Sequence, residues 1–243
     1  MIFLIIVLAL VGCGNKETGK ANPTPSPSPL ILPTVRSSVL PTFQLTVQPT
    51  VQPTPTLLVL GPLFDPALDI KAELVEVPLK LQIPSLKVDA PVLGVGLNPD
   101  NVMDTPRGPI GDAVWHTAFW YRGSGLPGES GTATFAGHVN DPLGRFEIFA
   151  NLEDLQSGDL IIMHYITQNI DIRFKVDEVK IYSLQESSDP AVLSRIYGAG
   201  PVAGTGPQPA PDGLSHLTLI TCAGNIVGGQ FDHHTVVFAT RSN

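Results

Sequence analysis

The sequence HLTLITC, at residues 216–222, decides the expected fold of this chain. It combines apolar and β-branched residues in the alternating pattern that is typical of a β-strand. Helical periodicity is weak and short, and it is clearest near residues 188–196. The strand pattern recurs at residues 79–83, 132–136, 170–176 and 235–239. It therefore predicts a mainly β domain, either a barrel or a sandwich.

Composition divides the 243-residue chain into three parts around these strands. Residues 76–243 hold all of the predicted strands, and about 170 residues are enough for one well-packed core. Within this part, the Gly- and Pro-rich residues 198–213 predict a long surface loop. Residues 14–75 are rich in Pro, Thr and Ser, which predicts a disordered spacer with extended, polyproline-like conformers. A disordered tail without a spacing role is the alternative.

Residues 1–13, MIFLIIVLALVGC, predict export. The apolar run at residues 1–11 is too short to span a bilayer and has the length of the h-region of a signal peptide. Its end, Leu10-Val11-Gly12-Cys13, resembles a bacterial lipobox, in which the cysteine is lipidated and becomes the mature N-terminus. The resemblance implies a lipoprotein held at the membrane through Cys13. No Lys or Arg precedes the run, and a plain cleaved signal or membrane anchor with an incidental cysteine is the alternative.

The balance of charges and the cysteine count exclude several classes of protein. Asp and Glu number 22 against 14 for Lys and Arg, a formal net charge of -8, whereas a nucleic-acid-binding protein needs a basic surface. Two cysteines exclude a disulfide scaffold and a cysteine-based zinc cluster. The six histidines are scattered except for His233 and His234, which would face opposite sides of a strand, so no metal site is predicted. No cofactor is implied either.

Two residues at the ends of predicted strands could carry chemistry. Cys222 follows the strand at residues 216–221 and precedes small residues, which would leave its thiol accessible to a substrate. If Cys13 is lipidated, Cys222 has no disulfide partner and is a lone thiol in an exported protein. A small buried core residue is the alternative for Cys222. His138 closes the strand at residues 132–137, and its imidazole could exchange protons with the thiol and with a leaving amine.

In combination, these motifs resemble those of the sortase family. Residues 217–222 (LTLITC) resemble the sequence around the sortase nucleophile, and residues 131–138 (GTATFAGH) resemble the strand that carries its histidine. Residues 83–92 resemble the first conserved strand pair, and residues 126–129 (LPGE) resemble the lead-in to the histidine. The likeness covers about residues 79–240. Further residues that stand where the family places them are Gly144, Phe146, Leu152, Leu155, Gly158 and Asp159.

The resemblance implies a closed β-barrel of about eight strands with short helices, and the activity of a cysteine transpeptidase. Cys222 would attack the carbonyl of the Thr–Gly bond in a sorting signal of the Leu-Pro-x-Thr-Gly type, and an amine would resolve the thioacyl-enzyme. His138 would be the general acid/base. The implied partners are proteins with C-terminal sorting signals and an amine acceptor on the cell wall or on another surface protein. The implied location is the extracellular face of the bacterial cytoplasmic membrane, at the cell surface.

One position departs from the sortase pattern. Sortases usually supply an arginine at the start of the strand after the cysteine, and His234 stands at or near that position here. Arg241 lies seven residues further on, roughly 23 Å along an extended chain, which is too far to take the role. We therefore predict that His234 takes it, as a donor or as a neutral hydrogen-bonding group, or that Arg107 or Arg145 reaches in from elsewhere. A surface residue of no consequence is the alternative for His234.

The missing arginine leaves a second class of function open. It is a non-catalytic or weakly hydrolytic sortase-like module that holds a peptide. Retention of Cys222 and His138 favours the enzyme, whereas the loss of the arginine favours the module. A structural spacer lipoprotein would account for the Pro-rich segment but not for the retained pair.

Overall fold

The computed structural model describes residues 74–242. The predicted signal segment with Cys13 and nearly all of the predicted spacer lie outside this range. Within it, no helix is both long enough and apolar enough to cross a membrane.

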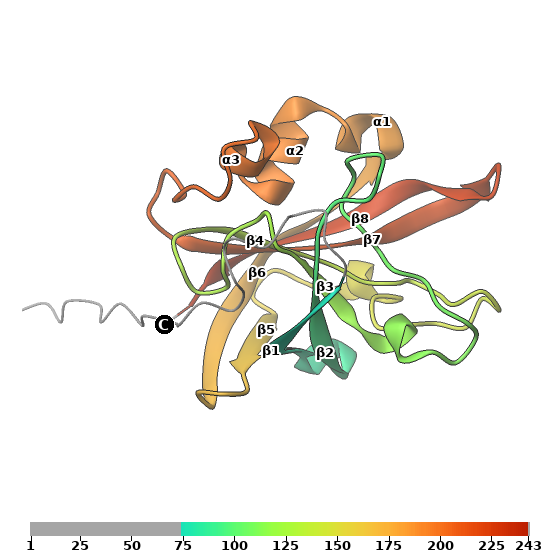
Figure 1. Cartoon of the computed structure of the whole chain (residues 1–243), viewed down its shortest axis with the longest axis horizontal. Helices are drawn as coiled ribbons and strands as arrows, with labels where there is room; N and C mark the ends of the chain where they lie inside the picture. The colour runs from blue at the N-terminus through green and yellow to red at the C-terminus, as the bar shows by residue number, and fades with distance from the viewer. Residues whose placement is uncertain (1–73, 243) are drawn as a thin grey trace, which may run out of the picture. The chain divides into compact units, whose positions relative to one another are not determined.

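Eight β-strands close into a barrel (Figure 1). Their order around the barrel is β1-β2-β3-β4-β7-β8-β6-β5. The prediction of a mainly β fold, a closed barrel with short helices, is confirmed. The strands are β1 (Val75–Ile83), β2 (Val88–Val95), β3 (Ala118–Tyr121), β4 (Gly131–Ala136), β5 (Leu160–Tyr165), β6 (Ile170–Ser183), β7 (Ser215–Val227) and β8 (Gln230–Arg241).

Two of the strand pairings are parallel, and they determine where the long connections run. β2 pairs with β3 and β4 pairs with β7 in parallel, whereas the other neighbours are antiparallel. Parallel neighbours cannot be joined by a tight turn and need a crossover of about a dozen residues or more. The first crossover is residues 96–117, here called the β2–β3 connection. The second runs from residue 137 to residue 214 and contains β5 and β6.

Short helices occupy the connections, and three of them gather on one side of the barrel, above β7 and β8 in Figure 1. Ser183 and Glu186 form a capping box at the start of the helix over Leu184–Ser187. Asp189 caps the next helix, which begins with Pro190. The helix predicted near residues 188–196 is confirmed, whereas the prediction of a continuous loop over residues 198–213 is wrong at its start. The helices are α1 (Leu184–Ser187), α2 (Pro190–Tyr197) and α3 (Ala199–Val202), with single 3-10 turns η1 (Pro84–Leu86), η2 (Ala113–His116) and η3 (Leu152–Asp154).

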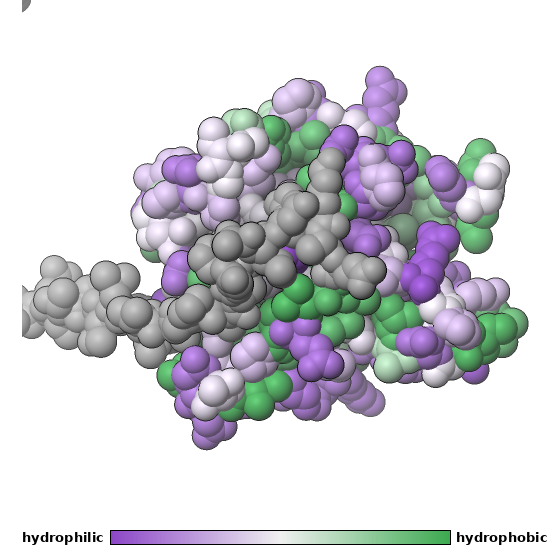
Figure 2. All heavy atoms as spheres, viewed as in Figure 1, coloured by the Kyte–Doolittle hydropathy of each residue, from purple (hydrophilic) through white to green (hydrophobic). Residues whose placement is uncertain are grey.

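β7 and β8 form one long hairpin. The strands predicted at residues 216–221 and 235–239 leave a loop over residues 223–233 between them, but that expectation is wrong, because β7 continues to Val227 and β8 begins at Gln230. Gly228 and Gly229 make the turn with φ values of 60° and 85°, the backbone conformation that a two-residue hairpin turn requires. Apolar side chains stand exposed at the projecting tip, at the upper right of Figure 2; they include Ile226.

Apolar side chains fill the inside of the barrel and also cover part of its outside. The interior holds Trp120, Phe135, Phe174 and other fully buried side chains, each of which stabilises the fold by about 1.5–3 kcal/mol through burial. A second cluster packs on the outer face, between the strands, the β2–β3 connection and α2. This outer cluster consists of Val95, Met103, Phe119, Tyr121, Ala136, Ile196, Ile220, Val236 and Phe238. This cluster therefore covers only part of the outer face of β3, β4, β7 and β8. The candidate site lies on the same face.

Candidate active site

The sequence predicted Cys222 at the end of a strand, and that prediction is wrong. Cys222 lies within β7, because the hairpin continues beyond it. Its thiol is free and its side chain is part-buried. Alternation along β7 puts Cys222 on the same outer face as Ile220. Burial raises the pKa of the Cys222 thiol, and the positive charge of Arg107 opposes that rise.

His138 lies two residues beyond the end of β4, at the same level as Cys222 on the neighbouring β7. β4 and β7 are parallel, with Ala136 paired to Ile220, so the residues two places further on, His138 and Cys222, come to the same level. Two hydrogen bonds continue this alignment past the end of β4. The Gly137 N–H donates to the Ile220 carbonyl at 3.2 Å, and the Thr221 hydroxyl donates to the Gly137 carbonyl at 2.8 Å.

The imidazole of His138 is held from three sides. Its Nε2–H donates to the Pro106 carbonyl oxygen, 2.8 Å away, which leaves Nδ1 as the acceptor nitrogen. Its ring packs against Trp115, at 4.6 Å between centroids, and edge-on against Phe119, at 5.5 Å. Burial lowers the pKa of His138, and Arg107 acts in the same direction. The hydrogen bond to Pro106 opposes this shift. The thiol and the imidazole therefore both favour their uncharged forms.

His234 faces Cys222 directly across the β7–β8 pair. Residues in such a position share one face of the sheet, with Cβ atoms about 4.5–5.5 Å apart. His234 Nδ1 lies 3.1 Å from the Ser187 hydroxyl oxygen at the end of α1, and burial lowers its pKa. Its neighbour His233 has a different partner, Asp232, at 2.6 Å.

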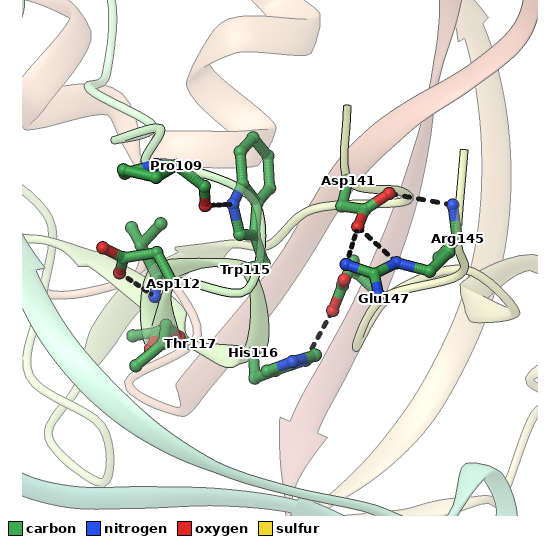
Figure 3. A network of polar contacts seen from close by, with 10 residues as sticks. Pro109, Asp112, Trp115, His116, Thr117, Asp141, Arg145 and Glu147 are labelled. Carbon is green, nitrogen blue, oxygen red and sulfur yellow. Dashed lines mark hydrogen bonds and ion pairs between the residues drawn. The ribbon is translucent and has the colours of Figure 1, made fainter. Parts of the chain in front are cut away.

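Arg107 and Arg145 were the candidates for the missing cation, whereas Arg241 was excluded, and the three differ in what they contact. Arg145 binds the buried carboxylate of Asp141 through Nε, at 2.6 Å, and through Nη2, at 2.5 Å (Figure 3). Arg241 donates through Nη1 to the Gly128 carbonyl, at 2.7 Å. Arg107 is exposed on the β2–β3 connection, and its charge acts on both Cys222 and His138.

Several polar contacts fasten the β2–β3 connection around Trp115, whose ring packs against His138; Figure 3 shows these polar contacts. Trp115 donates through Nε1 to the Pro109 carbonyl at 2.9 Å, and Asp112 accepts from the Val114 N–H at 2.9 Å to begin η2. His116 Nδ1 lies 2.5 Å from the buried carboxylate of Glu147. These contacts fix the position of Trp115 and with it the wall of the site.

A cavity of about 440 Å³ opens beside His234, between the β2–β3 connection and helices α1 to α3. Its lining is largely apolar, and the few polar groups include Ser187, Ser188 and His234. No Asp, Glu, Lys or Arg lines it. The cavity, here called the apolar groove, therefore suits uncharged, apolar side chains of an extended peptide. The apolar lining includes Leu97, Met103, Tyr121, Leu193, Ile196 and Ile220.

The structure brings together Cys222, His138 and His234, whereas Cys13 lies outside the described residues. Sequence reasoning missed Ser187, Pro106 and Trp115, which contact the two histidines. All three lie on crossovers without strand periodicity, so the sequence carries no signal for these contacts. Within residues 74–242, no group of three or more His, Cys, Asp or Glu side chains is arranged to hold a metal ion.

A model of the sortase domain family matches residues 81–242, and the chain belongs to this family. The resemblance of the motifs to sortases is thereby confirmed. Comparison with curated protein sequences finds no match.

Solved sortase structures resemble the chain at low sequence identity. Sortase A from Corynebacterium diphtheriae is 21% identical with a TM-score of 0.46, and the match covers 68% of this chain and 60% of that one. The pilus-related sortase C of Group B Streptococcus is 20% identical with a TM-score of 0.46, and the match covers 69% and 68% of the two chains. Sortase C-1 from Actinomyces oris is 20% identical with a TM-score of 0.44, covering 68% and 71%. The chain thus spans less than two thirds of the length of the Corynebacterium protein.

Proposed function

We propose that this protein is a cysteine transpeptidase that cleaves a sorting signal of the Leu-Pro-x-Thr-Gly type and transfers the acyl group to an amine at the cell surface. The observation that carries the proposal is that His138, just past the end of β4, and Cys222, on β7, lie at one level, next to an apolar groove. The thiol sulfur attacks the peptide carbonyl and an amine leaves, which gives a thioacyl-enzyme. A second amine then attacks the thioester and restores the thiol.

His138 is the acid/base group that serves the amines. Its Nε2–H is engaged by the Pro106 carbonyl, so Nδ1 is the nitrogen that can take a proton. A pKa lowered by burial keeps that nitrogen unprotonated at neutral pH, so that it is free to accept a proton. Arg107 replaces the arginine that β8 lacks opposite Cys222, because its charge favours the thiolate and would also favour the oxyanion that forms on the attacked carbonyl.

The apolar groove would hold the Leu-Pro part of the signal. Its lining offers no charged partner, so the residues of the signal that enter it should be uncharged. The amine acceptor belongs to the cell wall or to another surface protein, as the family's chemistry implies.

The N-terminal part of the chain would tether the enzyme at the extracellular face of the cytoplasmic membrane. Residues 1–13 would direct export, Cys13 would carry the lipid, and residues 14–75 would hold the barrel domain, residues 76–243, away from the bilayer. Membrane fractionation of a Cys13→Ser variant tests this proposal. Retention of the variant in the membrane without attached lipid would contradict it.

A peptide-binding module without catalysis is the second candidate. Two observations favour it: β8 carries no arginine opposite Cys222, and the Pro106 carbonyl occupies one nitrogen of His138. Such a module would bind the signal in the apolar groove and leave it intact.

The deciding experiment uses a Leu-Pro-Ala-Thr-Gly peptide with hydroxylamine as the amine. Wild-type protein should release the glycine end and form a hydroxamate, and Cys222→Ala should form none while keeping the wild-type unfolding midpoint. Peptide binding without cleavage would establish the module instead. Equal cleavage by Cys222→Ala would remove Cys222 from the reaction.

A further inference from the structure

His234 occupies the position at which an arginine was expected, yet its surroundings suit an uncharged ring. It lies opposite Cys222, on the floor of the apolar groove. Its side chain contacts the neutral hydroxyl of Ser187, 3.1 Å from Nδ1. Burial lowers the pKa of His234, which favours the neutral imidazole at pH 7.

The hydrogen bonds of Ser187 determine which nitrogen of His234 carries the proton. A serine hydroxyl has one hydrogen to donate and lone pairs with which to accept. Ser187 donates its hydrogen to the Leu184 carbonyl at 3.1 Å, and a carbonyl can only accept. With its hydrogen directed to Leu184, the Ser187 oxygen would accept from His234, and this arrangement requires the hydrogen on Nδ1 and a lone pair on Nε2.

We propose that His234 accepts the proton of the Cys222 thiol, with Ser187 as the positioning residue that holds His234 in the required tautomer. The arrangement is a nucleophile, a base and a group that orients the base, all placed by β7, β8 and the end of α1. This inference rests on the proposed function. It means that the position at which sortases usually carry an arginine, a cationic donor, here holds a proton acceptor, His234.

The proton balance is closed within the site. The thiol proton moves to Nε2 of His234 as sulfur bonds to the peptide carbonyl carbon. When the carbon–nitrogen bond breaks, its electron pair stays on the departing nitrogen, which takes the proton from His234. The products are a thioester, a neutral amine and a neutral imidazole. In the second half of the cycle the amine nitrogen bonds to the thioester carbon, and its proton returns to sulfur through His234.

This assignment leaves a separate task for His138. Amines in water at neutral pH are mostly ammonium ions, which cannot attack a thioester. His138 Nδ1 takes one proton from the arriving ammonium and passes it to solvent, and it does the reverse for the departing amine. The two histidines thus act on different protons of one reaction.

The tautomer can be measured without any substrate. Nitrogen-15 spectra of the full chain labelled at histidine distinguish Nδ1–H, Nε2–H and the imidazolium, and His234→Gln assigns the signal. Wild-type protein should show Nδ1–H at position 234, and Ser187→Ala should lose this preference. Ser188→Ala is the matched control, because its hydroxyl donates to Leu184 at 2.8 Å and not to His234. An Nε2–H or charged His234 at pH 7 would overturn the proposal.

Thiol alkylation by iodoacetamide tests the proton transfer, again without a peptide. His234→Gln should be alkylated more slowly than wild type at pH 7. The two rates should converge at a pH high enough for the thiol to ionise without help, which a merely structural role would not produce. His233→Gln serves as the control, because His233 binds Asp232. Equal rates for wild type and His234→Gln at pH 7 would overturn the proposal.

The peptide reaction separates an acceptor from a donor at position 234. Both His234→Arg and His234→Gln should slow thioacyl-enzyme formation about a hundredfold or more, since neither side chain can take the proton. An Arg variant as fast as wild type would overturn the proposal, because a cationic donor would then suffice. If wild-type protein binds the peptide without cleaving it, the proposed function fails, and the tautomer and alkylation measurements still decide the role of His234.

Discussion

The two faces of β7 differ in what they contribute. Leu217 and Leu219 point into the barrel and are completely buried there. Ile220 and Cys222, on the same strand, point to the outer face, where Cys222 keeps part of its surface exposed. The barrel interior is filled, so a peptide can reach the strand only from outside. One strand therefore separates stability from chemistry by simple alternation of its side chains.

The largest effect should come from the inner face. Leu219→Ala removes a fully buried side chain and should lower the free energy of unfolding by about 2–5 kcal/mol. Cys222→Ala, three residues further along the same strand, should change it by about 0.5 kcal/mol or less. Urea denaturation of both variants measures the contrast. A large loss in Cys222→Ala would mean that the outer face also supports the fold.

A smaller effect should appear in the pH dependence of stability. Burial lowers the pKa of both His138 and His234, so the unfolded chain binds protons more readily than the folded one. The free energy of unfolding should therefore fall as the pH drops below about 6.5, the ordinary pKa of histidine. Urea midpoints between pH 7.5 and 5.5 measure this. The double variant His138→Gln/His234→Gln should flatten the decline, whereas Leu219→Ala should keep it.

The smallest effect concerns the charge that reaches the outer face from the β2–β3 connection. Arg107→Ala should move the alkylation profile of Cys222 to higher pH, because the guanidinium holds down the thiol pKa that burial raises. Arg173→Ala is the matched control, since Arg173 pairs with Asp171 on β6. Coincident profiles for wild type and Arg107→Ala would contradict this role of Arg107, and the missing cation would then have to be another residue.

The inner face was the predictable part of this molecule. Alternation at residues 217–221 and 235–239 marks strands whatever their neighbours are, because burial of every second side chain stabilises them locally. The family motifs extended this to a closed barrel. The tight turn at Gly228-Gly229 was not predicted, because the length of the hairpin depends on pairing between strands, which local patterns do not record.

The outer face was predictable only in part. Cys222, His138 and His234 stood out through motifs, and the pairing of β4, β7 and β8 brings them to one level. Ser187, Pro106 and Trp115 come from crossovers far away in the chain, and no periodicity marks a side chain that meets its partner only in the folded molecule. The sequence did not predict the parts of the site that come from the long crossovers between the strands.

The parallel pairing of β4 with β7 also bears on the order of events during folding. The two strands are separated by residues 137–214, and bringing their ends together requires that whole segment to be arranged first. The entropy lost in closing a loop grows only with the logarithm of its length, but it must be lost before the pairing can stabilise anything. Contacts of such long sequence separation are formed slowly. Cys222 and His138 therefore meet only when the barrel closes. In a chain that has not yet folded completely, the thiol is present but its histidine does not lie beside it.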